Sequence, residues 1–223
     1  MKVILFGASG MVGQAVLREC LLNKSVAEVL SIGRRASGAS DPKLRELILP
    51  DLFDFSIDPA DLREFDACLF CLGVSSVGME PAEYERLTFD LTTSWASLLA
   101  RSNPNLTFIY VSGAGTGGRA KWAQIKGRTE NELFRLFTSS YMIRLGAMRP
   151  MHGEVSKTRW TRIGYAIMRP IFPLVAAIAP SAVITSEDLA RGMIDVAAHG
   201  AAKRVLGNND LRTIARSKVR GAV

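Results

Sequence analysis

The apolar residues of this chain form short continuous runs that alternate with segments of helical spacing. Runs typical of buried strands occupy residues 3–6, 29–32, 47–49, 67–71, 106–111 and 141–145. Helical spacing extends over residues 11–22, 81–101 and 121–137. Continuous apolar strands that alternate with helices indicate a parallel sheet covered on both faces. Because crossovers between parallel strands are right-handed, the pattern predicts a doubly wound α/β sheet.

The alternation weakens after residue 146. A helix is expected over Arg159–Met168, and the apolar stretch 170–184 is interrupted by three prolines. A membrane-spanning helix needs about 20 apolar residues, so this stretch is not expected to span. Ser186-Glu187-Asp188 is typical of a helix N-terminus and leads into residues 189–198. We expect one domain, 1–223, in which residues 147–223 form a small helical C-terminal subregion over the sheet edge.

The strongest motif is a glycine loop between the first strand and the first helix. Gly7, Gly10 and Gly13 are spaced as GxxGxxG. In that context the first glycine permits a tight turn, the second lets the backbone approach a pyrophosphate, and the third allows close helix–strand packing. Free amides and the positive dipole end of the helix suit phosphates. The sequence therefore predicts a dinucleotide-binding Rossmann unit, with these loop residues in contact with the cofactor: Gly7, Ser9, Gly10, Met11, Val12 and Gly13.

The second strand ends in Gly33-Arg34-Arg35. An NAD site commonly has a carboxylate there for the ribose 2′-hydroxyl, whereas guanidinium groups suit a 2′-phosphate. We therefore expect NADP(H) to be favoured over NAD(H), the alternative being that both arginines are solvated turn charges. Asp51, with Leu52 beside it, is a candidate for the adenine amine or a simple turn residue. The fourth strand ends in residues expected to lie along the adenosine half of the cofactor: Cys71, Leu72 and Gly73.

The charge of the chain is unevenly distributed. Residues 144–223 contain 13 Lys and Arg against 5 Asp and Glu, whereas residues 1–143 contain 15 against 16. The basic last third is compatible with an anionic substrate, with weak membrane-surface contact through residues 157–169, or with a solvated face and a frayed basic tail. Nucleic acid is not expected, because aromatic residues that could stack on bases are scarce there. His152 is an isolated candidate acid or base.

The three cysteines are few and odd in number, which suits a reducing compartment. Cys68 and Cys71 form a CxxC pattern that is also found in redox and zinc sites. Here they fall on an apolar strand, where an odd separation directs two side chains to opposite faces. We therefore interpret them as buried structural cysteines and expect no metal. The N-terminal apolar run is too short for a signal peptide, so a cytoplasmic protein is expected.

Several of these motifs together resemble the atypical branch of the short-chain dehydrogenase/reductase superfamily. The resemblance covers about residues 1–150 and is closest to small bacterial Tat-interacting oxidoreductase-like and NAD-dependent epimerase/dehydratase proteins. The matching segments are Gly7–Gly13, Cys71–Gly73, Phe108–Ser112, Ile125–Gly127 with Glu130 and Glu132, and Arg149-Pro150. It implies an oxidoreductase or epimerase that acts on a small substrate, as a monomer or homodimer.

The resemblance also implies catalytic roles for Ser112, which would polarise the substrate, and for Lys126, which would hold the nicotinamide ribose. The family's general acid is a tyrosine four residues before that lysine, and this chain has Trp122 there. An indole N–H donates a hydrogen bond but does not release its proton near neutral pH. Trp122 either stacks on a ring in the cleft or packs on the sheet, and Tyr110 is a surrogate acid or a core aromatic.

Two functional hypotheses follow. The first is an NADP(H)-binding enzyme, supported by Ser112 and Lys126. The alternative without catalysis is that Ser112 is only a strand-end hydroxyl and Lys126 only a surface lysine. The second is a nucleotide-sensing or interaction protein that binds NADP(H) without turnover, supported by Trp122.

Overall fold

The structure, a computed structural model, describes residues 1–154 and 182–217. A single parallel sheet has the strand order β3-β2-β1-β4-β5-β6-β9, and β7 pairs with β8 in a separate two-stranded parallel sheet. The strands of the two sheets are β1 (Lys2–Phe6), β2 (Glu28–Gly33), β3 (Leu44–Ile48), β4 (Ala67–Phe70), β5 (Thr107–Val111), β6 (Ser140–Ile143), β7 (Ala147–Arg149), β8 (Val183–Thr185) and β9 (Val205–Leu206).

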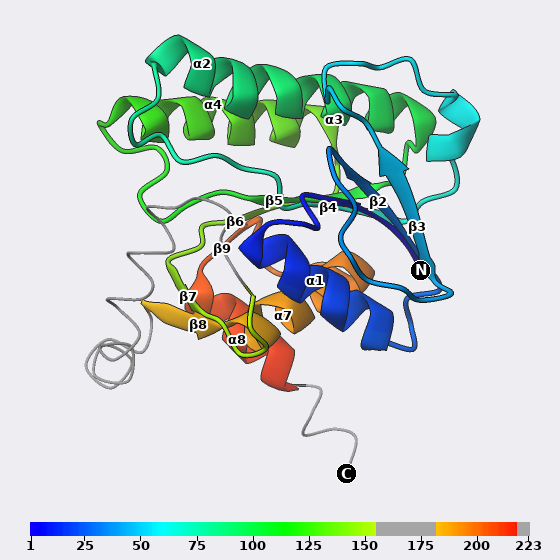
Figure 1. Ribbon diagram of the computed structural model, residues 1–223. Coiled ribbons are helices and arrows are strands. Elements are labelled where there is room, and N and C mark those ends of the chain that lie inside the picture. The colour runs from blue at the N-terminus through cyan, green and yellow to red at the C-terminus, as the bar shows by residue number, and fades with distance from the viewer. Residues whose placement is uncertain (155–181, 218–223) are drawn as a thin grey trace.

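Helices cover both faces of the sheet, as the sequence predicts (Figure 1). Helices α2, α3 and α4 lie on one face, and α1, α7 and α8 lie on the other. Their bounds are α1 (Met11–Leu22), α2 (Pro81–Glu85), α3 (Leu91–Ser102), α4 (Lys121–Leu136), α7 (Ser186–His199) and α8 (Asn208–Ser217), with a short 3₁₀ turn at Pro59–Leu62. The doubly wound α/β fold is therefore confirmed.

The two faces bury separate apolar cores because side chains alternate along each strand. In β1, Val3 and Leu5 join the core under α1 and α7, whereas Ile4 and Phe6 join the core under α3. Cys68 belongs to the second core and Cys71 packs against the first, so the two cysteines do lie on opposite faces. Burial raises the pKa of both thiols, the reverse of what a reactive or metal-binding thiolate requires.

The helix expected over residues 81–101 is present as one continuous helical segment with a π-helical turn at Arg86–Asp90 between α2 and α3. Trp95 of α3 is fully buried, and its indole N–H donates to the Leu52 carbonyl at 2.9 Å. This bond ties the loop after β3 to the helical layer. It fixes one wall of the pocket described below.

The expectation of a frayed basic tail is wrong for residues 203–217. Val205 and Leu206 form β9, which extends the main sheet beside β6, and α8 packs on α7. The helix expected from Ser186 is present, and its N-cap is Thr185, whose hydroxyl accepts from the Asp188 amide at 3.0 Å. The helix expected over Arg159–Met168 lies outside the described residues. Within residues 1–154 and 182–217, no helix has both the length and the apolar character needed to cross a membrane.

Helix α1 lies very close to the end of β1. A Cβ atom built on Gly13 would be 2.0 Å from the Gly7 carbonyl oxygen and 2.9 Å from the Ala8 Cα. These are backbone atoms that cannot rotate away, so only glycine fits at this crossing.

We therefore expect Gly13→Ala to lower the free energy of unfolding by about 2–3 kcal/mol, since the helix must move off the strand. Urea denaturation followed by circular dichroism measures this. Gly127→Ala in α4 is the control, because its Cβ would make only an ordinary contact at 3.4 Å. Equal stability of the two variants would contradict the close-packing argument.

Candidate functional site

The glycine loop connects β1 to α1 in a strained turn. Gly7 has φ +79°, and a Cβ there would be 2.9 Å from the Cys71 carbonyl and the Leu72 nitrogen. Its carbonyl oxygen accepts from the Gly10 amide at 2.8 Å. The loop is thus locked against the end of β4 as well as against α1.

The N-terminus of α1 is free of internal capping groups. Gly10 is the N-cap, no side chain bonds to the first-turn amides, and the first turn has no acidic residue. The first amides of a helix have no intrahelical acceptor, so they are available to an anion. Met11 and Val12 begin this helix and are partly buried.

A pocket of about 490 Å³ opens beside this loop. It lies at the carboxyl ends of the N-terminal strands, where parallel sheets commonly bind ligands. Its walls come from the glycine loop, the end of β2, the loop after β3 and the end of β4. The lining residues are Gly7, Ala8, Ser9, Ser31, Gly33, Arg34, Arg35, Pro50, Leu52 and Leu72.

Arg34 and Arg35 supply the charge of this pocket. Both are exposed, and neither guanidinium forms a salt bridge or hydrogen bond with any residue that the structure describes. Most arginines elsewhere in the described chain have a partner, for example Arg45 with Asp61 at 3.0 Å. Two unpaired guanidinium groups at a pocket edge are suited to bind a phosphate.

The remaining residues predicted for the adenosine half are distributed around this pocket. Leu52 and Leu72 line it. Asp51 is exposed, and its Oδ1 accepts from the Phe53 amide at 2.9 Å in a local turn. Cys71 follows β4 and is partly buried, and nothing lies within 4 Å of a Cβ built on Gly73. Ala8, which lies within the glycine motif, also lines the pocket, as do Ser31 and Pro50, which no sequence motif marked.

A second group of polar residues lies at the end of β5. Ser112 is 6% exposed, and its hydroxyl lies 2.7 Å from the Thr116 hydroxyl. Thr116 in turn donates to the Gly113 carbonyl at 2.8 Å. Ser112 and Thr116 therefore share one hydrogen bond, in which either hydroxyl can be the donor. Sequence reasoning missed Thr116, which no spacing rule identifies.

Lys126 of α4 is partly buried and donates from Nζ to the Tyr110 hydroxyl at 3.2 Å. The surface-lysine interpretation is therefore wrong. Burial lowers the pKa of Lys126 to about 8, although the nearby carboxylate of Glu130 acts to raise it. Tyr110 is 1% exposed and packs in the core, so it is a core aromatic. Burial raises the pKa of its phenol above the usual range.

Trp122 is half-buried and lies over the glycines that follow β5. Cβ atoms built on Gly115 and Gly113 would be 3.5 Å and 3.8 Å from its indole ring. Its indole N–H has no hydrogen-bond partner among the described residues. Trp122 therefore packs on the loop beside Ser112, one helical turn before Lys126.

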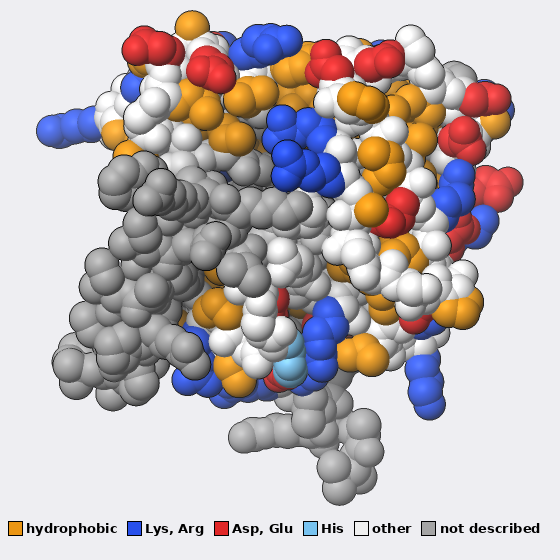
Figure 2. All heavy atoms as spheres, viewed as in Figure 1, with side chains coloured by type: hydrophobic (Ala, Val, Ile, Leu, Met, Phe, Trp, Pro, Cys, Tyr) orange, Lys and Arg blue, Asp and Glu red, His pale blue; other side chains and the backbone are white. Residues whose placement is uncertain are grey.

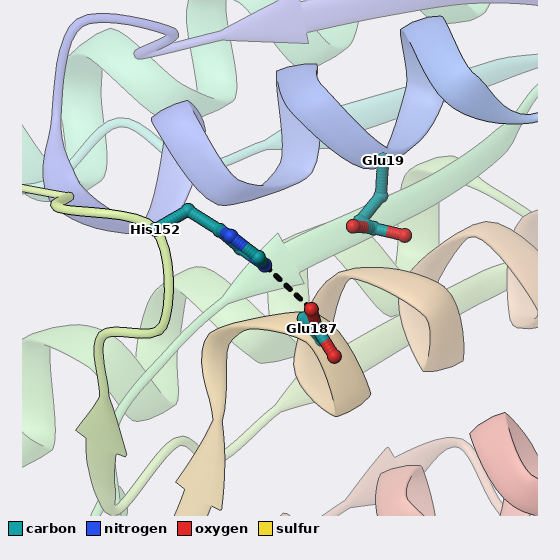
Figure 3. A group of neighbouring side chains, drawn as sticks. All are labelled: Glu19, His152 and Glu187. Atoms are coloured by element: carbon teal, nitrogen blue, oxygen red, sulfur yellow. Dashed lines mark hydrogen bonds and ion pairs between the residues drawn. The ribbon is translucent and has the colours of Figure 1, made fainter.

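His152 forms part of an ion-pair cluster on the face of the sheet that α1 and α7 cover (Figure 3). Its Nε2 lies 2.5 Å from Glu187 Oε1. A carboxylate oxygen of Glu19 lies within 4.8 Å of the ring nitrogen of His152 and of the Glu187 oxygen. This geometry could suit a cation, but the buried Glu19 carboxylate already pairs with Arg18 and with Arg191, the latter at 2.8 Å. The guanidinium groups of Arg18 and Arg191 balance the carboxylates of Glu19 and Glu187. The cluster therefore ties α1 to α7 and has no excess negative charge for a metal ion.

Those basic residues of the last third that the structure describes mostly have partners within the fold. The Arg144 guanidinium binds the buried Glu130 carboxylate at 2.7 Å, and Arg216 binds Asp188 at 2.8 Å. Arg204 donates to the Phe137 carbonyl at 3.0 Å. Figure 2 shows the Lys and Arg side chains of one face in separate groups. These arginines connect different elements of the fold. Residues 157–169, Lys218 and Arg220 lie outside the described residues.

Comparison with solved structures agrees with this architecture. UDP-glucuronic acid 4-epimerase from Bacillus cereus, solved with NAD, superposes with a TM-score of 0.66 at 14% identity, covering 93% of this chain and 78% of the epimerase. A short-chain dehydrogenase/reductase superfamily protein from Agrobacterium tumefaciens with bound NAD gives 0.65 at 14% identity, covering 99% and 82%.

The enzyme WbmF from Bordetella bronchiseptica, in complex with NAD⁺, gives 0.66 at 16% identity, covering 100% of this chain and 79% of WbmF. No protein-family model matches the sequence, and no curated protein is significantly similar to it. The chain therefore has the fold of short-chain dehydrogenase/reductase and epimerase structures.

Gly10 allows a test of the glycine loop that leaves folding intact. Its φ of −86° and ψ of 165° are accessible to any residue, and the nearest atom to an added Cβ is the Gly7 oxygen at 3.3 Å. We expect Gly10→Ala to change the free energy of unfolding by less than about 1 kcal/mol. The added methyl group should weaken dinucleotide binding at least about tenfold, because the backbone can no longer approach the pyrophosphate closely. Fluorescence titration with NADPH measures the affinity, and unchanged affinity would contradict a role for this loop in binding.

Proposed function

We propose that this chain is an NADP(H)-dependent oxidoreductase or epimerase that acts on a hydroxyl or carbonyl group of a small substrate. The observation that carries the proposal is the pair of guanidinium groups of Arg34 and Arg35, which have no partner among the described residues, at the edge of the pocket beside the glycine loop. A 2′-phosphate is the group by which NADP(H) differs from NAD(H), and a guanidinium fork matches it.

The residues of the pocket fit such a cofactor. Gly10 and Gly13 leave the backbone without side chains where α1 begins, and the uncapped amides of that helix suit the pyrophosphate. Leu52 and Leu72 provide apolar walls for the adenosine half. When bound, the nicotinamide would supply hydride chemistry. The NAD found in the structurally similar enzymes supports a nicotinamide dinucleotide as the ligand class.

Two side chains, one at the end of β5 and one on α4, would bind the substrate and the ribose of the cofactor. The Ser112 hydroxyl, which lies 2.7 Å from the Thr116 hydroxyl, would hydrogen-bond the substrate oxygen and so orient it. Lys126 has N–H groups beyond the one given to Tyr110, and these can bind ribose hydroxyls. The non-catalytic alternative rests on Trp122 alone. The joint presence of Ser112 and Lys126 at one end of the sheet supports the enzyme.

The double variant Arg34→Ala/Arg35→Ala tests the cofactor preference. We expect NADPH affinity to fall about 10- to 100-fold, since two charge-assisted contacts to the phosphate are lost. NADH affinity should change less than about threefold. Fluorescence titration with both cofactors measures this, and Arg45→Ala, whose side chain pairs with Asp61 away from the pocket, is the control. A wild-type preference for NADH would contradict the assignment.

A further inference from the structure

We propose that the Lys126 ammonium group is itself the acid and base that exchanges a proton with the substrate oxygen. This inference rests on the function proposed above. It assigns a proton-transfer role to a residue whose expected role was to hold the ribose, and it accounts for chemistry at a site that has Trp122 in place of a phenol.

The position of Lys126 is the first support. Lys126 lies four residues after Trp122, so both side chains leave α4 on the same face, toward the end of β5. Its Nζ reaches the hydroxyl of Tyr110, which shares a strand face with Ser112 two residues on. The ammonium group is therefore held at the carboxyl end of β5, on the side where Ser112 lies.

The other proton donors near this point are occupied or unsuitable. The hydroxyls of Ser112 and Thr116 are hydrogen-bonded to each other, and the Thr116 hydroxyl also lies 2.8 Å from the Gly113 carbonyl. The phenol of Tyr110 is buried in the core, and Tyr84 is 3% exposed. The indole of Trp122 does not release its proton. Lys126 lies at this end of the sheet, is partly buried, and has an ammonium group that can give up a proton.

The charges around Lys126 set its titration. Tyr110 faces it from β5, with Tyr84 of α2 beyond, and Glu130 lies one turn further along α4. Glu130 is paired with Arg144, which offsets the effect of its carboxylate on Lys126. Burial dominates and lowers the pKa of Lys126 to about 8. The group can therefore donate a proton below pH 8 and accept one above it, close to the optimum for acid–base catalysis.

In the direction of reduction, an Nζ–H bond of Lys126 breaks and an O–H bond forms on the substrate oxygen, leaving a neutral amine. A bound dihydronicotinamide would supply the hydride and with it both electrons. The amine then recovers its proton from water.

Titration of Lys126 can be measured without a substrate. Brief acetylation with acetic anhydride at a series of pH values, read by mass spectrometry, reports the fraction of free amine at each lysine. We expect Lys126 to reach half-maximal reactivity near pH 8, whereas an ordinary lysine titrates near 10.4. Saturating NADP⁺ should slow acetylation of Lys126 but not of the exposed Lys24. A midpoint near the ordinary lysine value would overturn the proposal.

Turnover separates proton transfer from ribose binding. NADPH oxidation with 9,10-phenanthrenequinone as the carbonyl probe is followed from pH 6 to 10. We expect the wild-type rate to fall about tenfold per pH unit above pH 8, where the ammonium form is lost. Lys126→Arg keeps the positive charge and the donors but cannot release a proton. It should bind NADPH within about threefold of wild type, lose at least about 100-fold in rate, and show no inflection near pH 8.

Lys121→Met is the matched control, because Lys121 is exposed on the same helix. It should keep both the rate and the inflection. Wild-type rate and pH profile in Lys126→Arg would overturn the proposal, as would NADPH binding by wild type without quinone turnover. Failure of the proposed function is distinguishable, because NADPH would then not bind and would give no protection of Lys126 from acetylation.

Discussion

The contact between Gly13 and the Gly7 carbonyl is the constraint on which the rest of the site depends. Helix α1 can begin directly over the end of β1 only because Gly13 has no side chain. The first-turn amides of α1, which no side chain caps, therefore lie beside the end of β1. The same turn presses Gly7 on the backbone of Cys71 and Leu72, so one packing requirement sets the relation of three strands and a helix around the pocket.

The sequence was sufficient for most of the sheet because continuous apolar runs identify strands that are buried on both faces. It was also sufficient for the glycine loop, because the close packing there permits only glycine at Gly7 and Gly13. After residue 146 it predicted the helix that begins at Ser186 but missed β9, which has only two residues and joins the sheet through Val205 and Leu206. Runs of that length give no periodicity. The arginines around it suggested a solvated tail, yet Arg204 and Arg216 are fixed by partners that are distant in sequence.

The candidate site shows the same division. Arg34 and Arg35 could be recognised from their place after β2, but that they are unpaired depends on what surrounds them. The Ser112–Thr116–Gly113 chain of hydrogen bonds could not be predicted, because it depends on the loop conformation after β5. The environment of Lys126 also comes from tertiary packing: Tyr110 lies 16 positions away, and burial between α4 and β5 lowers the pKa of the lysine to about 8.

The central claim is that the glycine loop and the two arginines form one dinucleotide site. A crystal structure of the chain with NADP⁺ tests this most directly. We predict the pyrophosphate within hydrogen-bond distance of the backbone amides of residues 9–12, with the 2′-phosphate against the guanidinium groups of Arg34 and Arg35. A dinucleotide bound elsewhere, or a 2′-phosphate directed away from both arginines, would contradict it.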